Sequence, residues 1–563
     1  MSPRETHPFR ARFSPRRCAA AVLGLGLWIA ASELLTPWIT RATLRAGGAW
    51  EYALLLWLMI ASRSAITAIL FFTLLSAALS STTFVESRVG AASPRALACI
   101  RIVVCSILLA SVLWEHLPST AELPAEMIQP MGVMKLLHAV PGFSALSRSA
   151  AALGVFQAAT AVLLLLGVIG WRARLVLPLA AFAYLILGGI LRQYSWFFHT
   201  GLVPLYVLFV VAMTPCADAL SLDRRRRLRQ GALVPDPAPD PRYGWSRYAC
   251  WTALALPYFM AGLSKIRNGG AAWFEGGSLK SILLRDTLDP MEFDWRVTLR
   301  LADLPDGFFA LMAVAAVASE IAYVSVLFSR RARVVVPALT ALLHLGIWFL
   351  QNVLFFDLIL LQLLFVDWDR LARRVRDLAA GPGASAARRA LARPLGGGPS
   401  STRDAAAPGG IPASVVASRI AAAAWAPRLR FMTGLLLFCW LALVEQYPFT
   451  AFQMYSGAAN TGSISYLRVE AHYASGETAR APIERIFPAL RDSRYRGALR
   501  GCFEPARRPA CDALLEALLA ADRGSDSPDA LRSIEVQLRQ SGLETPPPGP
   551  EYGTVTSRYR YPA

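Results

Sequence analysis

Residues 150–191 read AAALGVFQAATAVLLLLGVIG, then WRAR, then LVLPLAAFAYLILGGIL, so that two apolar blocks flank a short basic loop. Each block has about 20 residues, the length at which an α-helix crosses the hydrocarbon core of a bilayer. Neither block contains a charged residue, whereas the loop between them holds Arg172 and Arg174. This stretch therefore predicts two membrane-spanning helices that are joined at a cytoplasmic face.

The same pattern recurs along the whole chain of 563 residues, of which 55% are hydrophobic and 17% charged. We predict eleven candidate spans at about 18–39, 52–79, 99–115, 150–170, 175–191, 201–215, 247–264, 307–328, 334–352, 353–366 and 431–446. The stretch 334–366 is also compatible with one long bent segment. The predicted fold class is an all-α polytopic membrane bundle of about 11 helices with a small C-terminal extracytoplasmic α+β domain. Composition excludes a soluble multidomain protein, a collagen-like chain and a disulfide scaffold.

Arginine determines the expected orientation. The net charge is +19, yet only three of the 57 basic residues are lysines. Five arginines precede the first apolar block, and others cluster in the loops 223–229, 330–333 and 370–376, whereas 116–147 has a single basic residue, Lys135. This alternation follows the positive-inside rule and gives no sign of a nucleic-acid groove. The N-terminus is therefore expected in the cytoplasm, without a cleavable signal peptide, and the C-terminal domain outside.

Composition divides the chain into five regions. Residues 377–430 are rich in Gly, Ala, Pro, Ser and Arg, which predicts a flexible cytoplasmic linker. Alternating stretches at 464–473 and 555–561, with a helical pattern around 513–521, predict the α+β domain. The expected regions are an N-terminal two-helix membrane hairpin (1–90), a transmembrane domain (91–370), the linker (371–430), the last transmembrane helix (431–446) and the extracytoplasmic domain (447–563).

Two of the eight cysteines differ from the rest. Six lie in or beside apolar blocks, where a free thiol acts as a small hydrophobe. Cys502 and Cys511 flank a polar run outside any span, so a disulfide is expected if this region lies in an oxidising compartment. Two unpaired thiols are the alternative. No CxxC pair and no metal-ligand spacing occurs, so no metal is expected.

Polar and ionisable residues at membrane depth are few: Arg192, His199, Lys265, Glu320 and His344, followed by Gln351, Asn352 and Asp357. Such residues are costly in a bilayer and are usually functional or paired within the bundle. Each also has an ordinary reading, since a histidine can simply pack, a lysine at a span end can snorkel, and an acid can pair with a base. A desolvated lysine can act as a base, however, and a nearby histidine can hydrogen-bond a developing oxyanion.

The stretch Tyr258-Phe-Met-Ala-Gly-Leu-Ser-Lys265, followed by Trp273-Phe-Glu275-Gly276, resembles a motif of vitamin K-dependent gamma-carboxylases. It also resembles their bacterial relatives, the horizontally transferred transmembrane (HTTM) domain proteins. Trp196-Phe-Phe-His199 and Pro215–Asp223 are similar to further family motifs, and Glu320 and His344 occupy positions where the family has an acid and a histidine. The resemblance covers roughly 95–370 and implies a multi-pass protein of a bacterial-type cell (inner) membrane.

The resemblance also implies a mechanism, with Lys265 as the catalytic base and His199 as the hydrogen-bond partner of the quinone oxygen. The lysine deprotonates a reduced naphthoquinone, and O2 converts the quinol into a strong base. That base removes a proton from a glutamate side chain, and CO2 adds to the carbanion, which is lyase chemistry. The pocket residues are Arg192, Trp196, Trp273, Glu275, Glu320 and His344. Lys265 and His199 are expected to face a shared cavity near the outer leaflet.

The implied partners are membrane lipids, a lipid quinone and a secreted protein or peptide as substrate. Two features depart from the family: Ser264 stands where carboxylases have a second lysine, and the large region that captures a propeptide has no counterpart. A non-catalytic membrane scaffold or small-molecule carrier is therefore an alternative. A transporter is less favoured, because no inverted repeat with broken spans is evident.

Overall fold

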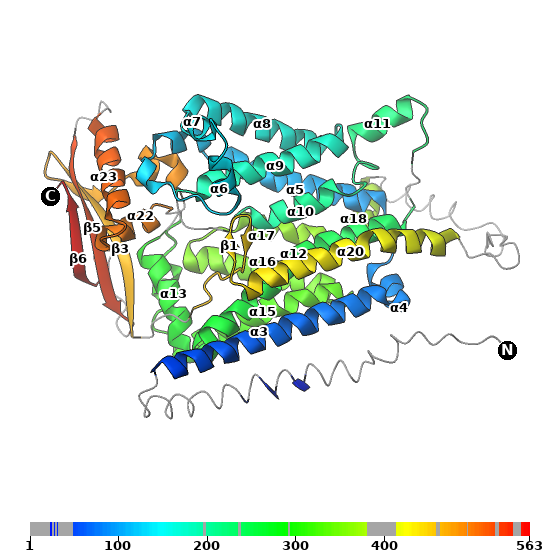
Figure 1. Ribbon diagram of the computed structural model, residues 1–563, viewed down its shortest axis with the longest axis horizontal. Coiled ribbons are helices and arrows are strands. Elements are labelled where there is room, and N and C mark those ends of the chain that lie inside the picture. Colours follow the sequence, from blue (N-terminus) through cyan, green and yellow to red (C-terminus); the bar gives the residue numbers. More distant parts are fainter. Residues whose placement is uncertain are drawn as a thin grey trace, which may run out of the picture.

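The computed structural model describes residues 49–194, 199–234, 238–290, 293–379, 413–457, 462–491, 494–523, 529–543 and 553–562, with residues 23, 24, 27, 28 and 31. Helices run along the long axis of the molecule, and a small sheet lies at one end (Figure 1). The longer helices of the bundle are α3 (Ala49–Ser80), α5 (Pro94–Trp114), α8 (Ala150–Ile169), α9 (Ala173–Arg192), α10 (Leu202–Ala212), α12 (Pro241–Gly269), α13 (Gly276–Leu288), α15 (Asp306–Ala322), α16 (Ala332–Gln351) and α20 (Ala413–Leu441). The shorter ones are α4 (Thr82–Phe84), α6 (Val133–His138), α7 (Phe143–Ser147), α11 (Leu222–Arg229), α14 (Val297–Leu301), α17 (Phe356–Leu361) and α18 (Trp368–Ala379).

Within the described residues, six helices are long and apolar enough to cross a membrane: Ala53–Ser80, Pro94–Trp114, Ala150–Ile169, Ala173–Arg192, Asp306–Leu327 and Ala332–Gln351. The predicted spans 201–215 and 353–366 coincide with shorter apolar helices. The predicted span 247–264 lies within α12, which is long but less apolar. The first predicted span, 18–39, falls almost entirely outside the described residues. The structure thus supports a multi-pass helical membrane protein with six clear spans, not the full count of eleven.

One boundary differs from the sequence-based prediction, and the alternative left open for 334–366 is decided in favour of the two predicted helices. The helix α20 begins at Ala413, inside the stretch predicted to be linker, so that 413–430 is helical. Its alanine-rich composition is favourable for a helix, and its buried Trp425 and Leu429 pack in the core. Between α16 and α17 the chain turns at Asn352, which has a left-handed backbone with φ of 59°. The stretch 334–366 is therefore two helices and not one bent segment.

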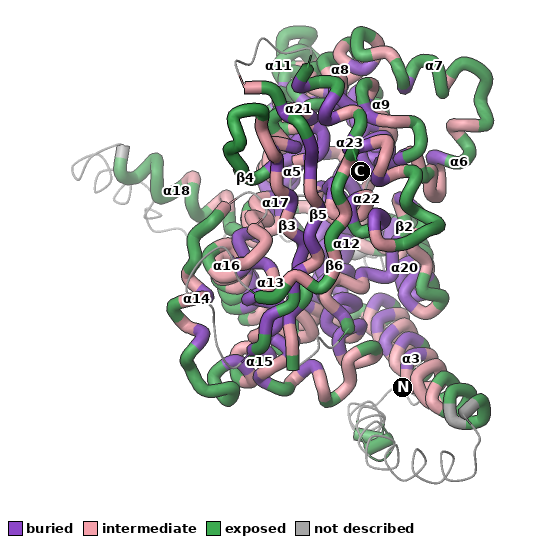
Figure 2. Tube along the Cα trace, turned by 90° about the vertical axis from the view of Figure 1, so that its left-hand side faces the viewer, coloured by how far each residue is buried: buried purple, intermediate pink, exposed green. Residues whose placement is uncertain are grey.

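α12 is the central helix of the bundle. Pro241 occupies its first turn, and the side chain of Asp240 accepts a hydrogen bond from the Arg242 amide, so that the start of the helix is capped. Most of its residues are buried, and it packs against α5, α10, α15 and α20. Viewed from the end that carries the sheet, buried residues concentrate in the middle of the bundle, while α18 projects from its side (Figure 2). A residue on α12 is thus held by neighbours on several sides.

After α20 the chain forms a two-stranded hairpin, β1 (Glu445–Gln446) and β2 (Phe449–Thr450). We call residues 445–457 the hairpin segment. It packs into the helix bundle, because Tyr447 is buried and its hydroxyl donates to the carbonyl of Leu185 at 2.8 Å. The predicted domain 447–563 therefore begins with a segment that packs against the membrane domain, and the sheet domain proper starts at about residue 462.

The C-terminal sheet has four antiparallel strands in the order β4-β3-β5-β6. Its strands are β3 (Ser463–Tyr473), β4 (Thr478–Arg480), β5 (Leu531–Gly542) and β6 (Thr554–Tyr561). Its helices are α21 (Ile483–Ile486), α22 (Arg496–Arg500) and α23 (Arg508–Arg523). The predicted strands at 464–473 and 555–561 and the predicted helix are present. Cys502 and Cys511 form the expected disulfide, with 5.3 Å between their Cα atoms.

One end of the bundle carries a dense group of arginines. The helix α11 contains five arginines and lies at the end opposite to the C-terminal sheet (Figure 1). This separation agrees with an orientation in which arginine-rich loops face the cytoplasm and the sheet domain lies outside. The side of the membrane on which each terminus lies remains a prediction.

Candidate functional site

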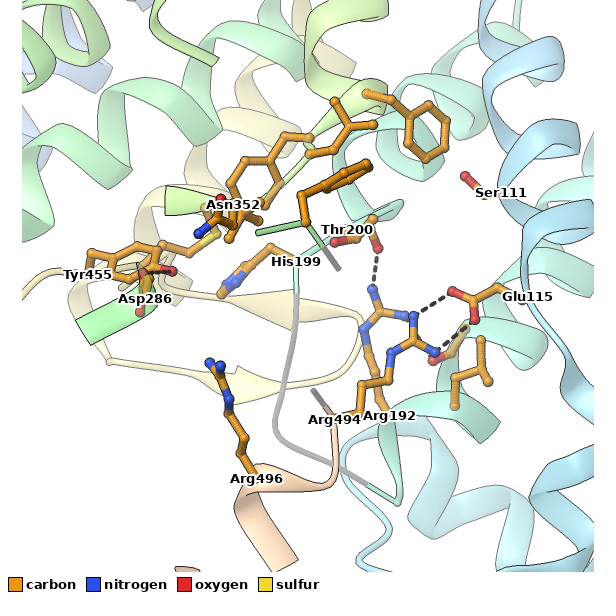
Figure 3. Close-up of a pocket in the computed structure, with 18 of the residues that line it drawn as sticks. Ser111, Glu115, Arg192, His199, Thr200, Asp286, Asn352, Tyr455, Arg494 and Arg496 are labelled. Atoms are coloured by element: carbon orange, nitrogen blue, oxygen red, sulfur yellow. Dashed lines mark hydrogen bonds and ion pairs between the residues drawn. The ribbon is translucent and has the colours of Figure 1, made fainter. Parts of the chain in front are cut away.

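A cavity of about 1050 Å³ lies where the helix bundle meets the C-terminal domain. Its wall is formed by α5, α9, α13, the turn at 352–356, the hairpin segment, and three arginines and a tyrosine of the C-terminal domain (Figure 3). Part of the wall is apolar, including Leu187, Leu191, Phe355 and Phe356. The cavity has the size and mixed lining of a site for an amphipathic small molecule.

Most charges in the cavity wall are compensated by an opposite charge. Arg494 forms two hydrogen bonds with the carboxylate of Glu115, at 2.6 and 2.7 Å. Arg496 pairs with Asp289 at 2.8 Å, and Arg285 with Asp286 at 3.1 Å. The charged part of the wall therefore has no strong excess of either sign.

His199 lines this cavity and is held by the hairpin segment. Its Nε2 lies 3.0 Å from Oγ1 of Thr450, and its ring lies 5.6 Å from that of Phe452. Because the Thr450 hydroxyl donates to Glu445 at 2.8 Å, His199 must be the donor from Nε2, which leaves the lone pair on Nδ1. Burial, with a smaller contribution from Arg192, lowers the pKa of His199 to about 3. His199 is thus a neutral imidazole at physiological pH.

Arg192 also lines the cavity, and its side chain contacts three separate parts of the chain. It is buried and donates to the carbonyls of Gly188, at 2.8 Å, and Thr200, at 2.7 Å. Its guanidinium lies 4.7 Å from the ring centre of Tyr447 in the hairpin segment. The side chain thereby joins the end of α9, the loop that carries His199 and the hairpin segment.

Lys265 is buried near the end of α12 and pairs with Glu320 of α15. Its Nζ lies 2.9 and 2.8 Å from the two carboxylate oxygens and 5.7 Å from the ring centre of Trp273. Lys265, Glu320 and Trp273 are not among the residues that line the cavity. The adjacent Ser264 donates to the carbonyl of Ala451 at 3.2 Å.

Lys265 and His199 are thus connected through the hairpin segment and not through a common cavity wall. His199 contacts Thr450, whereas Ser264, the neighbour of Lys265, contacts the next residue, Ala451. Trp273 donates to the carbonyl of Tyr455, which is itself a lining residue. The lysine therefore lies behind the part of the cavity wall that the hairpin segment forms.

The remaining predicted site residues are dispersed. His344 accepts or donates a 2.7 Å hydrogen bond with the Tyr258 hydroxyl, in a buried cluster with Tyr323 and Gln362 behind Phe355. Glu275 is exposed at the start of α13. Trp196 lies outside the described residues.

The sequence-based prediction did not include several residues of the cavity among the site residues. Asn352 and Asp286 line it, as do Tyr455 and Arg494. Asn352 follows an apolar span, which is a recognisable signal. The other three carry no local signal, because they are far apart in sequence and meet only in the folded chain.

Residues 91–369 match the family model of the HTTM domain. The chain is therefore a helical membrane protein that carries an HTTM domain, the domain shared with vitamin K-dependent gamma-carboxylase. No curated protein and no solved structure matches the chain. The matched range contains His199, Lys265 and Glu320, whereas the hairpin segment and the C-terminal domain that complete the cavity lie beyond it.

Proposed function

We propose that this protein binds a reduced lipid quinone of the naphthoquinone type in the cavity beside His199, at the outer face of a bacterial-type cell (inner) membrane. The observation that carries the proposal is the cavity itself: about 1050 Å³, partly apolar, with a buried neutral imidazole in its wall, at one end of an HTTM domain. That volume accommodates a bicyclic head group with part of an isoprenoid tail.

The residues present fit such a group. The rings of Phe355 and Phe356 with Leu187 and Leu191 offer an apolar surface to an aromatic head group. His199, neutral and with its proton on Nε2 donated to Thr450, can accept a hydrogen bond at Nδ1 from the hydroxyl of a quinol without bringing a charge into the cavity. When bound, a reduced naphthoquinone supplies, together with O2, a base strong enough to remove a proton from carbon, after which CO2 can add.

The role proposed for Lys265 is that of a base. Its Nζ lies 2.8 Å from a carboxylate oxygen of Glu320, so Glu320 is the group proposed to take up the proton of the lysine. The lysine would then have to act through the part of the hairpin segment that separates it from the cavity. A secreted protein or peptide is the proposed acceptor substrate, because the C-terminal domain borders the cavity on the proposed outer side.

Oxygen consumption tests the catalytic proposal. Membranes with the full-length protein are supplied with naphthoquinols or ubiquinols, and Lys265→Arg and Lys265→Ala are compared with wild type. We expect both variants to lose activity, because arginine stays protonated. Lys280→Arg is the control, since Lys280 lies 4.0 Å from the largely exposed Asp306. Activity of Lys265→Arg equal to that of wild type would contradict the base role.

A second candidate function is a non-catalytic scaffold or carrier that binds the same ligand. It is favoured by the ion pair of Lys265 and Glu320. Nζ of Lys265 contacts both carboxylate oxygens of Glu320, and neither residue lines the cavity. Binding of a naphthoquinone without quinol-dependent oxygen consumption in the wild type would select this function over the enzyme.

Orientation is part of the proposal. The N-terminus and the region near residue 400 are placed in the cytoplasm, and Ala563 outside, from the distribution of arginine. Alkaline phosphatase fused after Ala563 should be active, and phosphatase fused near residue 400 should not. The reverse pattern would overturn the topology.

A further inference from the structure

Asn352 is a buried polar residue whose backbone conformation is unusual. It follows the last residue of α16, has a left-handed backbone with φ of 59°, and is 1% exposed. Its side chain lines the cavity, on the same side as His199, Asp286 and Tyr455 (Figure 3). Asparagine tolerates this conformation better than most residues, although glycine adopts it more easily still.

One hydrogen bond determines which way the Asn352 amide faces. Its Oδ1 accepts from the backbone amide of Trp295 at 2.9 Å, so the NH2 group must point the other way. Within the part of the chain that the structure describes, Nδ2 of Asn352 is buried and has no hydrogen-bond partner. An unpaired buried donor costs about 1–3 kcal/mol. A donor that is held in this position and left unpaired is prepared for an acceptor from outside the protein.

The polar neighbours do not supply that acceptor. The Tyr455 hydroxyl donates to Asp286, and Asp286 in turn pairs with Arg285. Asp286 and the Tyr455 hydroxyl therefore already have partners, whereas Nδ2 of Asn352 has none among the described residues. Within the described residues, these polar neighbours thus leave Nδ2 of Asn352 available to a molecule in the cavity.

We infer that Asn352 is a ligand-binding residue whose Nδ2 donates a hydrogen bond to a ligand oxygen in the cavity. This inference rests on the proposed function and identifies the oxygen as that of a quinone or quinol. A neutral oxygen suits the site, because the amide of Asn352 carries no charge and the carboxylate of Asp286 is already paired with Arg285. A carboxylate oxygen of a fatty acid has the same acceptor chemistry and is the alternative source.

Two substitutions separate the donor from the rest of the residue. Asn352→Asp keeps an oxygen for the Trp295 amide and tolerates the left-handed backbone, but it replaces the NH2 group. Asn352→Gly adds no charge and relieves the backbone conformation, which offsets the loss of the hydrogen bond from the Trp295 amide, so the variant should still fold. If the donor binds ligand, both variants should lose affinity.

The experiment uses the full-length protein in lipid nanodiscs, with fluorescence quenching as the readout. The probes are 2-methyl-1,4-naphthoquinone, its reduced form, and oleate. We expect the wild type to bind the naphthoquinone and both variants to bind it at least tenfold more weakly, with oleate binding unchanged. Wild-type affinity for the naphthoquinone in both variants would overturn the inference.

The remaining outcomes distinguish this inference from the proposed function. If the wild type binds oleate but no naphthoquinone, and both variants lose oleate, then Asn352 is a ligand donor and the quinone proposal is wrong. If the wild type binds none of the three probes, both the inference and the proposed function fail.

Discussion

Lys265 and Glu320 place two opposite charges where little water reaches them, with side chains 7% and 15% exposed. Burying two charges is costly, and their attraction offsets that cost only while both are present and well aligned. The two-oxygen contact with one ammonium provides this alignment. The pair therefore has a structural role whether or not Lys265 also acts as a base.

Glu320→Gln should destabilise the protein strongly. It leaves the ammonium of Lys265 buried beside a neutral amide, and removing one partner of a buried pair costs about 3–5 kcal/mol. The expected result is a lower midpoint of thermal unfolding in detergent. Asp306→Asn is the control, because Asp306 is 70% exposed and 4.0 Å from Lys280, and should change stability by less than about 0.5 kcal/mol. Equal effects of the two substitutions would refute the structural role.

His199 should make stability depend on pH. Its pKa falls from 6.5 when unfolded to about 3 when folded, so below pH 6.5 the unfolded chain binds more protons than the folded one. The free energy of unfolding should therefore fall as the pH falls from 6.5, by about 1.4 kcal/mol per unit. The difference in unfolding midpoint between wild type and His199→Gln should shrink from about pH 7.5 to pH 5. A constant difference would show that His199 is not held neutral.

The individual residues could be singled out from the sequence more reliably than their partners. Arg192, His199, Lys265 and Glu320 stand out because charge is rare in apolar blocks. Their contacts depend on which helices pack together, and Lys265 and Glu320 are 55 positions apart. The sequence therefore indicated the polar residues but not that the lysine and the histidine would lie on different sides of the hairpin segment.

α12 and α15 bring Lys265 and Glu320 together because they pack closely at a glycine. A Cβ atom on Gly262 would lie 2.7 Å from Cγ1 of Ile321 and 3.1 Å from Cβ of Glu320. Only a residue without a side chain permits this approach of the two helices. The ion pair one turn along α12 depends on the same approach.

Gly262→Val should push α15 away from α12 and weaken the ion pair. Overpacking of this kind costs about 1–3 kcal/mol. Gly346→Ala is the matched control, because a Cβ there meets nothing within 4 Å and helix propensity then favours alanine by about 1 kcal/mol. The midpoint of thermal unfolding should fall in Gly262→Val and rise in Gly346→Ala. A stability for Gly262→Val at or above that of wild type would contradict the packing argument.

At the scale of elements, the length of the apolar blocks predicted the membrane helices, whereas no sequence pattern predicted the position of the hairpin segment. Uncharged blocks of span length became helices, because a bilayer requires every backbone group to be paired internally. The hairpin segment mixes polar and aromatic residues, and nothing in its local pattern indicates that Tyr447 reaches α9. Its position follows from contacts with helices more than two hundred residues earlier in the chain.

The whole molecule is a membrane bundle completed at one end by its C-terminal domain. Arg494 connects the two parts through its double hydrogen bond with Glu115, with side chains only 5% and 12% exposed. The backbone amide of Ala489 also donates to Ser119 at 3.0 Å. The C-terminal domain thereby forms part of the cavity wall.

Arg494→Gln should loosen this junction. We expect the naphthoquinone Kd to rise by roughly tenfold, because the preorganised cavity wall is lost, with a fall in thermal stability. Arg507→Gln in the same domain is the control, since Arg507 and Glu504 form an exposed pair. Unchanged affinity in Arg494→Gln would show that the C-terminal domain does not shape the site.

The central claim is that a lipid quinone occupies the cavity between the HTTM domain and the C-terminal domain. The most direct measurement is an electron cryomicroscopy map of the full-length protein in lipid nanodiscs with a saturating naphthoquinol, kept reduced without O2. The account predicts density for the bicyclic ring against Phe355 and Phe356, with its oxygens in hydrogen-bond reach of His199 and Asn352. Density for the ring elsewhere, with this cavity unchanged by the ligand, would contradict it.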